Sequence, residues 1–176
     1  MKELPCNIRL IEKADLPQFK TIRRYALEES PRAFGKYPYE LDEISNDTLV
    51  TMVCPGPGQV TFGAFIQSGE IIATAGMFRG KHAKLFHAGT IWGVYVRPEF
   101  RGKGISKSLL KELIEYSSTL EGLSVLNLKV GQSQLYAKSL YSSLGFKVVG
   151  KEEKSLKVDG IYLSEELMTL DMENRK

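Results

Sequence analysis

The sequence contains few of the side chains that form covalent cross-links or metal sites. Its 176 residues include two cysteines, Cys6 and Cys54, which lie far apart and form no CxxC pattern, and two histidines, His82 and His87. Structural zinc sites are recognised by cysteine and histidine ligands at short spacing, which this sequence lacks. We therefore interpret both cysteines as thiols, expect the histidines at the surface or at strand edges, and predict no bound metal.

Long hydrophobic runs and a targeting segment are also missing from the sequence. No apolar run approaches the roughly 18 to 20 residues of a membrane-spanning helix. Residues 1–5 contain no apolar stretch of the signal-peptide type. We therefore predict a cytoplasmic protein that does not bind a membrane.

Charge of one sign is not in strong excess. The sequence has 24 Lys and Arg against 21 Asp and Glu, which gives a formal net charge of +3. This mild basicity suits an anionic ligand, but it is too weak and too dispersed to predict a nucleic-acid-binding surface. We therefore expect no nucleic-acid partner.

The composition that is present is ordinary for a compact globular protein. Hydrophobic residues make up 43% and charged residues 26% of the chain, so the chain can bury a sizeable core. We predict a single domain over residues 1–176, with its core at about residues 7–171.

Hydrophobic periodicity predicts a mixed α/β fold in the order β-α-loop-β-β-β-α-β-α-β-β. Strands are expected at residues 7–12, 60–66, 71–78, 84–96, 123–130, 146–149 and 161–170; helices are expected after Asp15 and at residues 104–119 and 133–144. Asp159-Gly160 is a two-residue hairpin signal. In the last helix, Tyr136, Leu140 and Leu144 recur at helical spacing and predict a packed stripe. Residues 30–47 are expected to form a loop that includes a short helix. The identity of the acceptor is expected to depend on this loop and on a second loop at residues 152–160.

The segment at residues 91–110 joins an apolar strand to an amphipathic helix through a basic, glycine-containing turn. A helix N-terminus normally favours acidic residues, yet this one carries Arg101, Lys103 and Lys107. Gly102 and Gly104 would let an anion approach the backbone closely. The pattern predicts a phosphate-binding turn, with solvated lysines before a helix as the alternative. A dinucleotide site is set aside because the third glycine of G-x-G-x-x-G is missing.

Two segments resemble the GNAT superfamily of N-acetyltransferases. Residues 101–106, RGKGIS, resemble its acetyl-CoA pyrophosphate motif Q/R-x-x-G-x-G/A, with Ser106 in the last position. Residues 130–146, VGQSQLYAKSLYSSLGF, resemble V-x-x-x-N-x-x-A-x-x-L-Y-x-x-x-G-F, with Gln134 where the family usually has asparagine. The resemblance extends over most of the chain, including residues 30–35 and 168–170.

The resemblance implies an α/β fold with a central, mostly antiparallel sheet, splayed middle strands and flanking helices. It implies acetyl-CoA as cosubstrate and acetyl transfer by direct attack of a primary amine of a small molecule, peptide or protein. Tyr141 falls on the family's catalytic tyrosine, which we expect to act as general acid toward the departing thiolate. The residues that the resemblance assigns to the cofactor are Val94, Tyr95, Val96, Arg101, Gly102, Lys103, Gly104, Ile105, Ser106 and Gln134.

The route by which the acceptor amine loses its proton is left open by the sequence. An amine of pKa near 10.4 is protonated at pH 7, so a base or a proton relay is required. The predicted strand up to Val96 contains no carboxylate, and water relays are an equal alternative. Trp92 either lines the acceptor pocket or packs in the core. The candidate bases are Glu28, Glu29, Glu40, Asp42, Glu43 and Glu70.

Two other functions compete with the enzyme hypothesis. A non-catalytic CoA-binding or regulatory module would keep the glycine turn but would not need Tyr141. Nucleic-acid binding through the basic turn is disfavoured because the other lysines are dispersed. The acceptor amine and the oligomeric state, a homodimer included, are left open by the sequence.

Overall fold

The computed structural model describes residues 6–56 and 58–173. The N-terminal segment on which the signal-peptide prediction depends lies outside this described part. Cys6 and Cys54 are both thiols, as expected. Among the described residues, the helices are all too short or too polar to cross a membrane.

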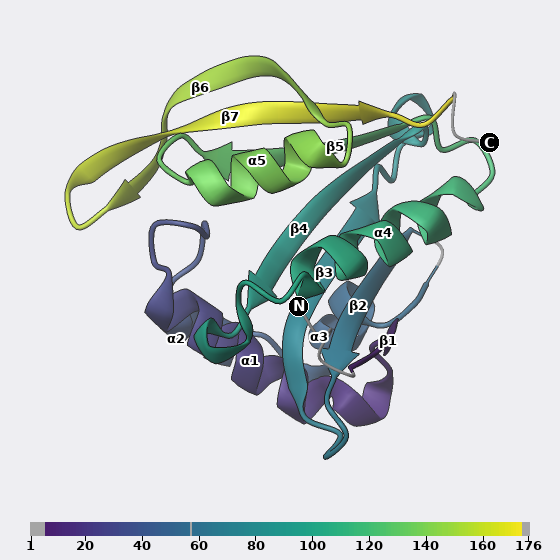
Figure 1. Ribbon diagram of the computed structural model, residues 1–176, viewed down its shortest axis with the longest axis vertical. Helices are drawn as coiled ribbons and strands as arrows, with labels where there is room; N and C mark the ends of the chain where they lie inside the picture. Colours follow the sequence, from purple (N-terminus) through teal and green to yellow (C-terminus); the bar gives the residue numbers. More distant parts are fainter. Residues whose placement is uncertain (1–5, 57, 174–176) are drawn as a thin grey trace.

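A seven-stranded sheet in the order β1-β2-β3-β4-β5-β7-β6 forms the centre of the fold (Figure 1). β4 and β5 pair in parallel, and the other neighbouring strands pair antiparallel. The expected mostly antiparallel α/β sheet is therefore confirmed. The strands are β1 (Asn7–Leu10), β2 (Gln59–Phe65), β3 (Ile71–Arg79), β4 (Ala88–Val96), β5 (Val125–Gly131), β6 (Lys147–Val158) and β7 (Ile161–Asp171).

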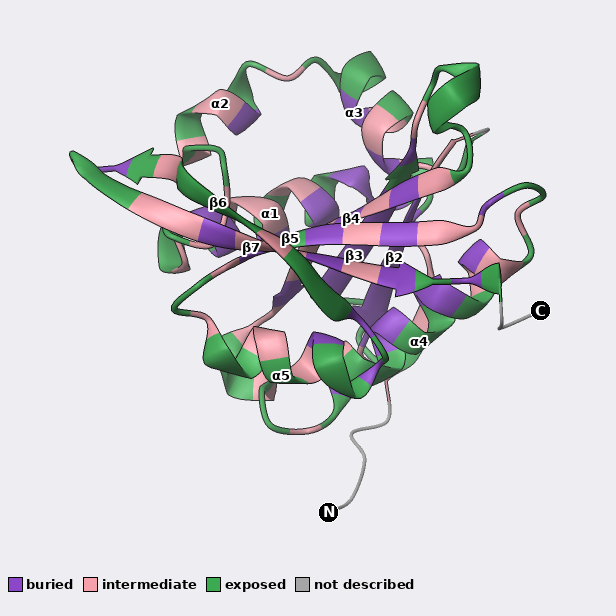
Figure 2. Cartoon of the chain, turned by 90° about the horizontal axis from the view of Figure 1, so that it is seen from above, coloured by how far each residue is buried: buried purple, intermediate pink, exposed green. Residues whose placement is uncertain are grey.

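Helices cover both faces of the sheet (Figure 2). On one face lie α1 (Leu16–Glu29), α2 (Pro38–Asp42) and α3 (Asn46–Val53), and on the other lie α4 (Ile105–Ser118) and α5 (Leu135–Ser143). Each long helix is amphipathic and buries its apolar stripe against the sheet. The buried residues of α4 include Ile105, Leu109, Leu110, Leu113 and Ile114, the side that the periodicity predicted.

The β6–β7 hairpin confirms one prediction and corrects another. Asp159 and Gly160 both have positive φ, 49° and 80°, as a two-residue hairpin turn of this type requires. The prediction of a loop at residues 152–160 is wrong, because β6 continues to Val158 before the turn. The strand reaches this length through irregularities in its pairing with β7, near Gly150 and between Glu152 and Leu156.

The prediction of a packed stripe on α5 is also wrong for its first residue, Tyr136. Tyr136 is 95% exposed, whereas Leu144 is 6% exposed. The helix begins at Leu135, so Tyr136 lies in its first turn, outward of the sheet. α3 is a further difference, since the sequence predicted no helix at residues 46–53.

A close cross-strand contact makes Gly76 a sensitive position. A Cβ at Gly76 would lie 2.6 Å from two ring atoms of Trp92, its neighbour on β4. We expect Gly76→Ala to displace the indole and to lower the free energy of unfolding by about 1–3 kcal/mol, the usual cost of overpacking. Urea denaturation measures the loss, and the emission of Trp92, the single tryptophan of the chain, reports the displacement.

Gly35→Ala is the matched control, since a Cβ there would meet Leu156 at 3.7 Å, an ordinary contact. Equal urea midpoints for the two variants would contradict the steric argument.

Candidate functional site

An opening in the sheet between β4 and β5 is the centre of the candidate site. The parallel pairing covers only Ala88–Thr90 against Val125–Asn127. Beyond these residues the two strands diverge (Figure 1), while β4 stays paired with β3 and β5 with β7. The splayed middle strands that the resemblance implied are therefore present, with residues 91–96 and 128–131 as the two sides of the opening.

Two of the three residues predicted on β4 turn their backbone toward this opening. The Arg97 N–H donates to the Ile72 carbonyl of β3 at 3.0 Å. The N–H and C=O groups of successive residues point to alternate sides of a strand. Those of Val94 and Val96 therefore point toward the opening, and those of Tyr95 point toward β3. The Val96 carbonyl accordingly accepts a hydrogen bond from Arg101 Nε at 2.9 Å.

A β-bulge at Gly93 sets the side-chain directions of β4. Gly93 has φ of 64°, its carbonyl accepts from Thr74 Oγ1 at 3.0 Å, and the pairing with β3 shifts between Thr74 and Gly76. Because the bulge adds one residue, Trp92 and Tyr95 both pack on the α1 side of the sheet, although they are three positions apart. The sequence analysis missed this bulge, although an isolated glycine within a strand pattern is its usual signal.

The turn before α4 has the backbone geometry of an anion site. Gly102 and Gly104 have φ of 73° and 79°, and Gly104 is the N-cap of the helix. A Cβ at either glycine would meet no atom within 4 Å, so the space beside both is open. The first turn, Ile105 and Ser106 included, has N–H groups without intrahelical partners and carries no acidic residue. This end of α4 therefore has the features of an anion-binding site.

A surface groove runs along α4, between this helix and the end of α5. Its volume is about 800 Å³. Lys107 and Lys111 of α4 line one side, and residues 142–145 line the other. Glu115 of α4 also lines the groove, so the two lysines leave it with a small excess of positive charge.

The two cationic side chains of the turn itself contact protein groups. Arg101 forms an ion pair with Glu29 at 2.7 Å, and Lys103 Nζ donates to the Glu99 carbonyl at 3.0 Å. The hydrogen bond from Arg101 lowers the pKa of Glu29 below its ordinary value. Glu29 is therefore a weaker base than an isolated glutamate, and the ion pair ties the turn to the end of α1.

Tyr141 and Gln134 lie on α5 and at its N-terminus. The Tyr141 side chain is 7% exposed, packs in the main core and meets the Phe146 ring edge-on, with centroids 6.0 Å apart. Burial raises the pKa of its phenol above the ordinary value, so the phenol keeps its proton at neutral pH. Gln134 is the N-cap residue of α5, and its side chain lies against Gly131 at the end of β5.

Several of the acids considered as bases are engaged elsewhere. Asp42 pairs with Arg24 and Glu70 with Arg97, and Glu40 accepts from the Tyr37 N–H at 2.6 Å at the start of α2. The hydrogen bond from Arg24 lowers the pKa of Asp42. His82 and His87 are exposed, as expected.

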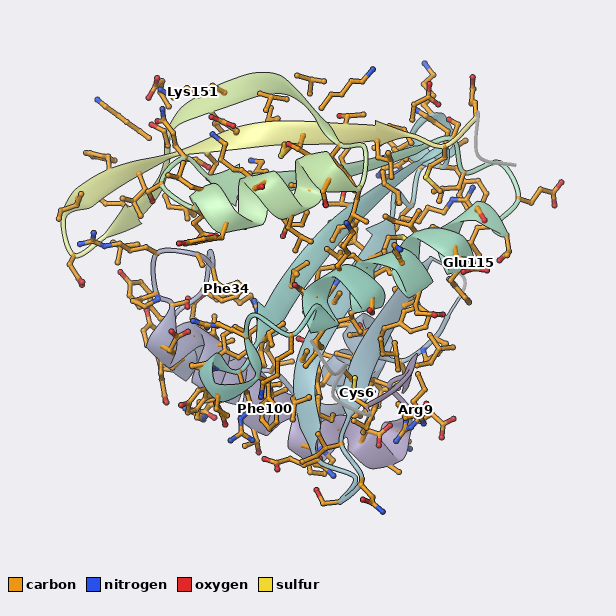
Figure 3. All side chains as sticks on the ribbon, in the orientation of Figure 1. Cys6, Arg9, Phe34, Phe100, Glu115 and Lys151 are labelled. Carbon is orange, nitrogen blue, oxygen red and sulfur yellow. The ribbon has the colours of Figure 1, made fainter. Side chains whose placement is uncertain are left out.

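An aromatic cluster that the sequence analysis missed lies on the α1 side of β4. Tyr95 meets the rings of Tyr25 and Phe34 edge-on, at 6.5 and 6.4 Å. The Arg23 guanidinium lies 4.5 Å from the Phe34 centroid and 5.8 Å from that of Trp92. Phe34 lies in the loop after α1, where Figure 3 labels it. Burial is the main cause that raises the pKa of Tyr95 to about 12.

GNAT acetyltransferases are the class of protein with this arrangement: the sheet is split between two parallel strands, and a glycine turn and a helix N-terminus lie beside the split. The model of the acetyltransferase (GNAT) family matches residues 19–146, and the chain belongs to this family. Human N-acetyltransferase 8 is 36% identical over 73 residues. That match spans 42% of this chain and only 29% of the human protein.

Solved structures share the fold over nearly the whole chain. A putative acetyltransferase from Salmonella typhimurium, with its cofactor acetyl-CoA, has a TM-score of 0.78 at 20% identity and covers 96% of this chain and 94% of its own. Spermidine N-acetyltransferase from Vibrio cholerae, in complex with CoA and spermine, has a TM-score of 0.75 at 20% identity, with 95% of each chain covered. At such identities the likeness shows the fold.

Proposed function

We propose that the chain is an acetyl-CoA-dependent N-acetyltransferase that acts on a primary amine by direct attack. The observation that carries the proposal is the open glycine turn at the N-terminus of α4, directly beside the gap between β4 and β5. Family membership supports the same activity.

The backbone of the turn would hold the diphosphate of the cosubstrate. The N–H groups from Gly102 to Ser106 converge at the helix end, where the helix dipole also favours an anion. Arg101 and Lys103 would contribute through their backbone, since their side chains contact Glu29 and the Glu99 carbonyl. Gln134 would contact the cosubstrate from the opposite side of the opening. When bound, acetyl-CoA supplies an activated acetyl thioester.

The N–H groups of Val94 and Val96 would bind and orient the pantetheine arm and the thioester. They face the opening and have no β5 carbonyl opposite them, because the β4–β5 pairing ends at Thr90. Donors fixed in this way stabilise negative charge on a carbonyl oxygen without reorganisation. Tyr95 would contribute its side chain to the acceptor side of the sheet.

Tyr141 would donate a proton to the sulfur of the departing thiolate. Its phenol is buried and keeps its proton at neutral pH, as a general acid must. Of the carboxylates on the acceptor side, Glu29 and Asp42 have lowered pKa values, so neither suits the role of general base. We favour a water relay for the proton of the amine, with Glu28, Glu40, Glu43 and Glu70 as the remaining carboxylate candidates.

Calorimetry with acetyl-CoA, followed by thiol release across an amine panel, tests this function. We expect binding of acetyl-CoA and release of thiol that depends on the acceptor. A folded protein that fails to bind acetyl-CoA, or that binds it and acetylates none of the amines, would contradict the proposal. The latter result would favour the non-catalytic CoA-binding module. A cytoplasmic location stays a prediction, which fractionation of cells tests.

A further inference from the structure

Arg23 is a partly buried cation without a carboxylate partner in the described part of the chain. Its Nη1 is shielded from solvent and has no hydrogen-bond partner there. Burial lowers the pKa of Arg23 to about 10, so the guanidinium still carries its charge at neutral pH. A buried, charged N–H without an acceptor costs free energy. Such an atom calls for an explanation.

The neighbouring arginines differ from Arg23 because each of them has a carboxylate partner. Arg24, the next residue of α1, pairs with Asp42; Arg97 pairs with Glu70 and Glu99; and Arg101 pairs with Glu29. The contacts that Arg23 does make are with the Phe34 and Trp92 rings. Cation–π contacts are made through the faces of the rings and satisfy no N–H group of the guanidinium.

The position of Arg23 places the unpaired N–H beside the reacting strand. Its Nη1 would lie 3.8 Å from a Cβ at Gly93, the bulge residue of β4. The backbone of this strand continues into Val94 and Val96, whose N–H groups face the opening. The loop that carries Phe34 also approaches the β6–β7 hairpin, because a Cβ at Gly35 would contact Leu156. Strand β4 and the loop that carries Phe34 therefore both lie beside this guanidinium.

A second buried polar atom supports a ligand site here. The Tyr95 hydroxyl is shielded from solvent and makes no hydrogen bond of ordinary length among the described residues. Burial and, to a smaller extent, the nearby Glu29 carboxylate raise the pKa of this phenol. Tyr95 and Arg23 both lie against the Phe34 ring. Arg23 and Tyr95 therefore place a cation and a hydroxyl beside an aromatic ring, the mixture of polar and apolar groups that is typical of small-molecule sites.

We propose that Arg23 binds a carboxylate of the acceptor, so that the substrate is a small aminocarboxylate. This inference depends on the acetyltransferase function proposed above and narrows its substrate. A single unpaired guanidinium matches a single negative charge, and its planar N–H groups match the geometry of a carboxylate. A doubly charged phosphate would need a second cation, and the nearby arginines are already paired. A diamine would be repelled by Arg23.

The proposal predicts opposite effects of one substitution on stability and on substrate binding. Arg23→Met keeps the apolar stem but removes the unpaired charge. We expect its urea midpoint to equal or exceed that of the unaltered protein, because a buried, unpaired charge is removed. We expect its KM for aminocarboxylates to rise about tenfold or more with little change in kcat, since a charge-assisted hydrogen bond is lost. A purely structural arginine would instead lower the urea midpoint.

The acceptor assay uses pairs of amines that differ in their charge. Leucine, β-alanine and their longer homologues up to ε-aminocaproate are each compared with the corresponding carboxamide, and 1,5-diaminopentane represents a cationic acceptor. We expect at least one acid to have a KM about tenfold or more below that of its carboxamide. Arg23→Met should abolish this preference. Arg24→Met is the matched control, since it removes the adjacent cation, which is paired with Asp42, and should keep the preference.

A binding measurement separates this inference from the proposed activity. Trp92 is the single tryptophan and lies 5.8 Å from the guanidinium, so its emission should change when the same aminocarboxylates are titrated into the protein with CoA present. Equal KM values for acids and carboxamides, or an unchanged preference in Arg23→Met, would overturn the role of Arg23. If no amine is acetylated, the proposed function fails, and the Trp92 titration still decides whether Arg23 binds a carboxylate.

Discussion

Tyr141→Phe is expected to acetylate amines about a hundredfold more slowly than the unaltered protein, while binding acetyl-CoA with unchanged affinity. The substitution removes only the phenolic oxygen and keeps the ring that packs against Phe146 at 6.0 Å. Because Tyr141 is 7% exposed, solvent water has little access to replace the lost proton donor. We therefore expect the decrease in kcat, measured by thiol release at saturating acetyl-CoA, and no change in KM for acetyl-CoA.

The same helix provides a matched control for this variant. Tyr136 is 95% exposed, so Tyr136→Phe should keep the full rate. Thermal unfolding of both variants checks that neither change disturbs the core. Full activity of Tyr141→Phe would show that Tyr141 serves packing alone, and the proton would then have to reach the thiolate from another donor.

The parts of the site that could be predicted from sequence are those fixed by local rules. Gly104 and the apolar stripe of α4 could be located because a helix start and its periodicity are properties of one short segment. The Asp159-Gly160 turn was predictable for the same reason, since both residues must adopt positive φ. The splayed strands were expected from the resemblance to the family, because strand divergence has no signal in the periodicity.

The parts that could not be predicted depend on packing between distant segments. The unpaired state of Arg23 is a consequence of how α1 lies against β4, whereas adjacent Arg24 forms an ion pair with Asp42 at the surface. The Arg101–Glu29 ion pair likewise joins the end of α1 to the turn before α4. Tyr136 was misjudged because spacing alone does not tell whether a stripe begins inside or outside the packed part of a helix.

Gly104→Val is expected to raise the Kd for acetyl-CoA about a hundredfold. This is the effect of losing two charge-assisted hydrogen bonds, each of which contributes about 1.5 kcal/mol to binding. The space beside Gly104 is free of protein atoms within 4 Å, so the new side chain would occupy the place that we assign to the diphosphate. Its φ of 79° is unfavourable for valine, and a turn that relaxes would also move the N–H groups away from the anion. Calorimetry with acetyl-CoA measures the loss.

Gly69→Val separates backbone strain from the loss of the anion contact. Gly69 has φ of 84° in the turn between β2 and β3, and a Cβ there also meets no atom within 4 Å. The two variants should therefore lose similar stability, by urea denaturation, while only Gly104→Val loses affinity for acetyl-CoA. Equal affinities in both variants would mean that the diphosphate does not lie against this turn. The site would then have to be sought elsewhere along the opening, because the N-terminus of α4 is the anion site on which the proposed activity depends.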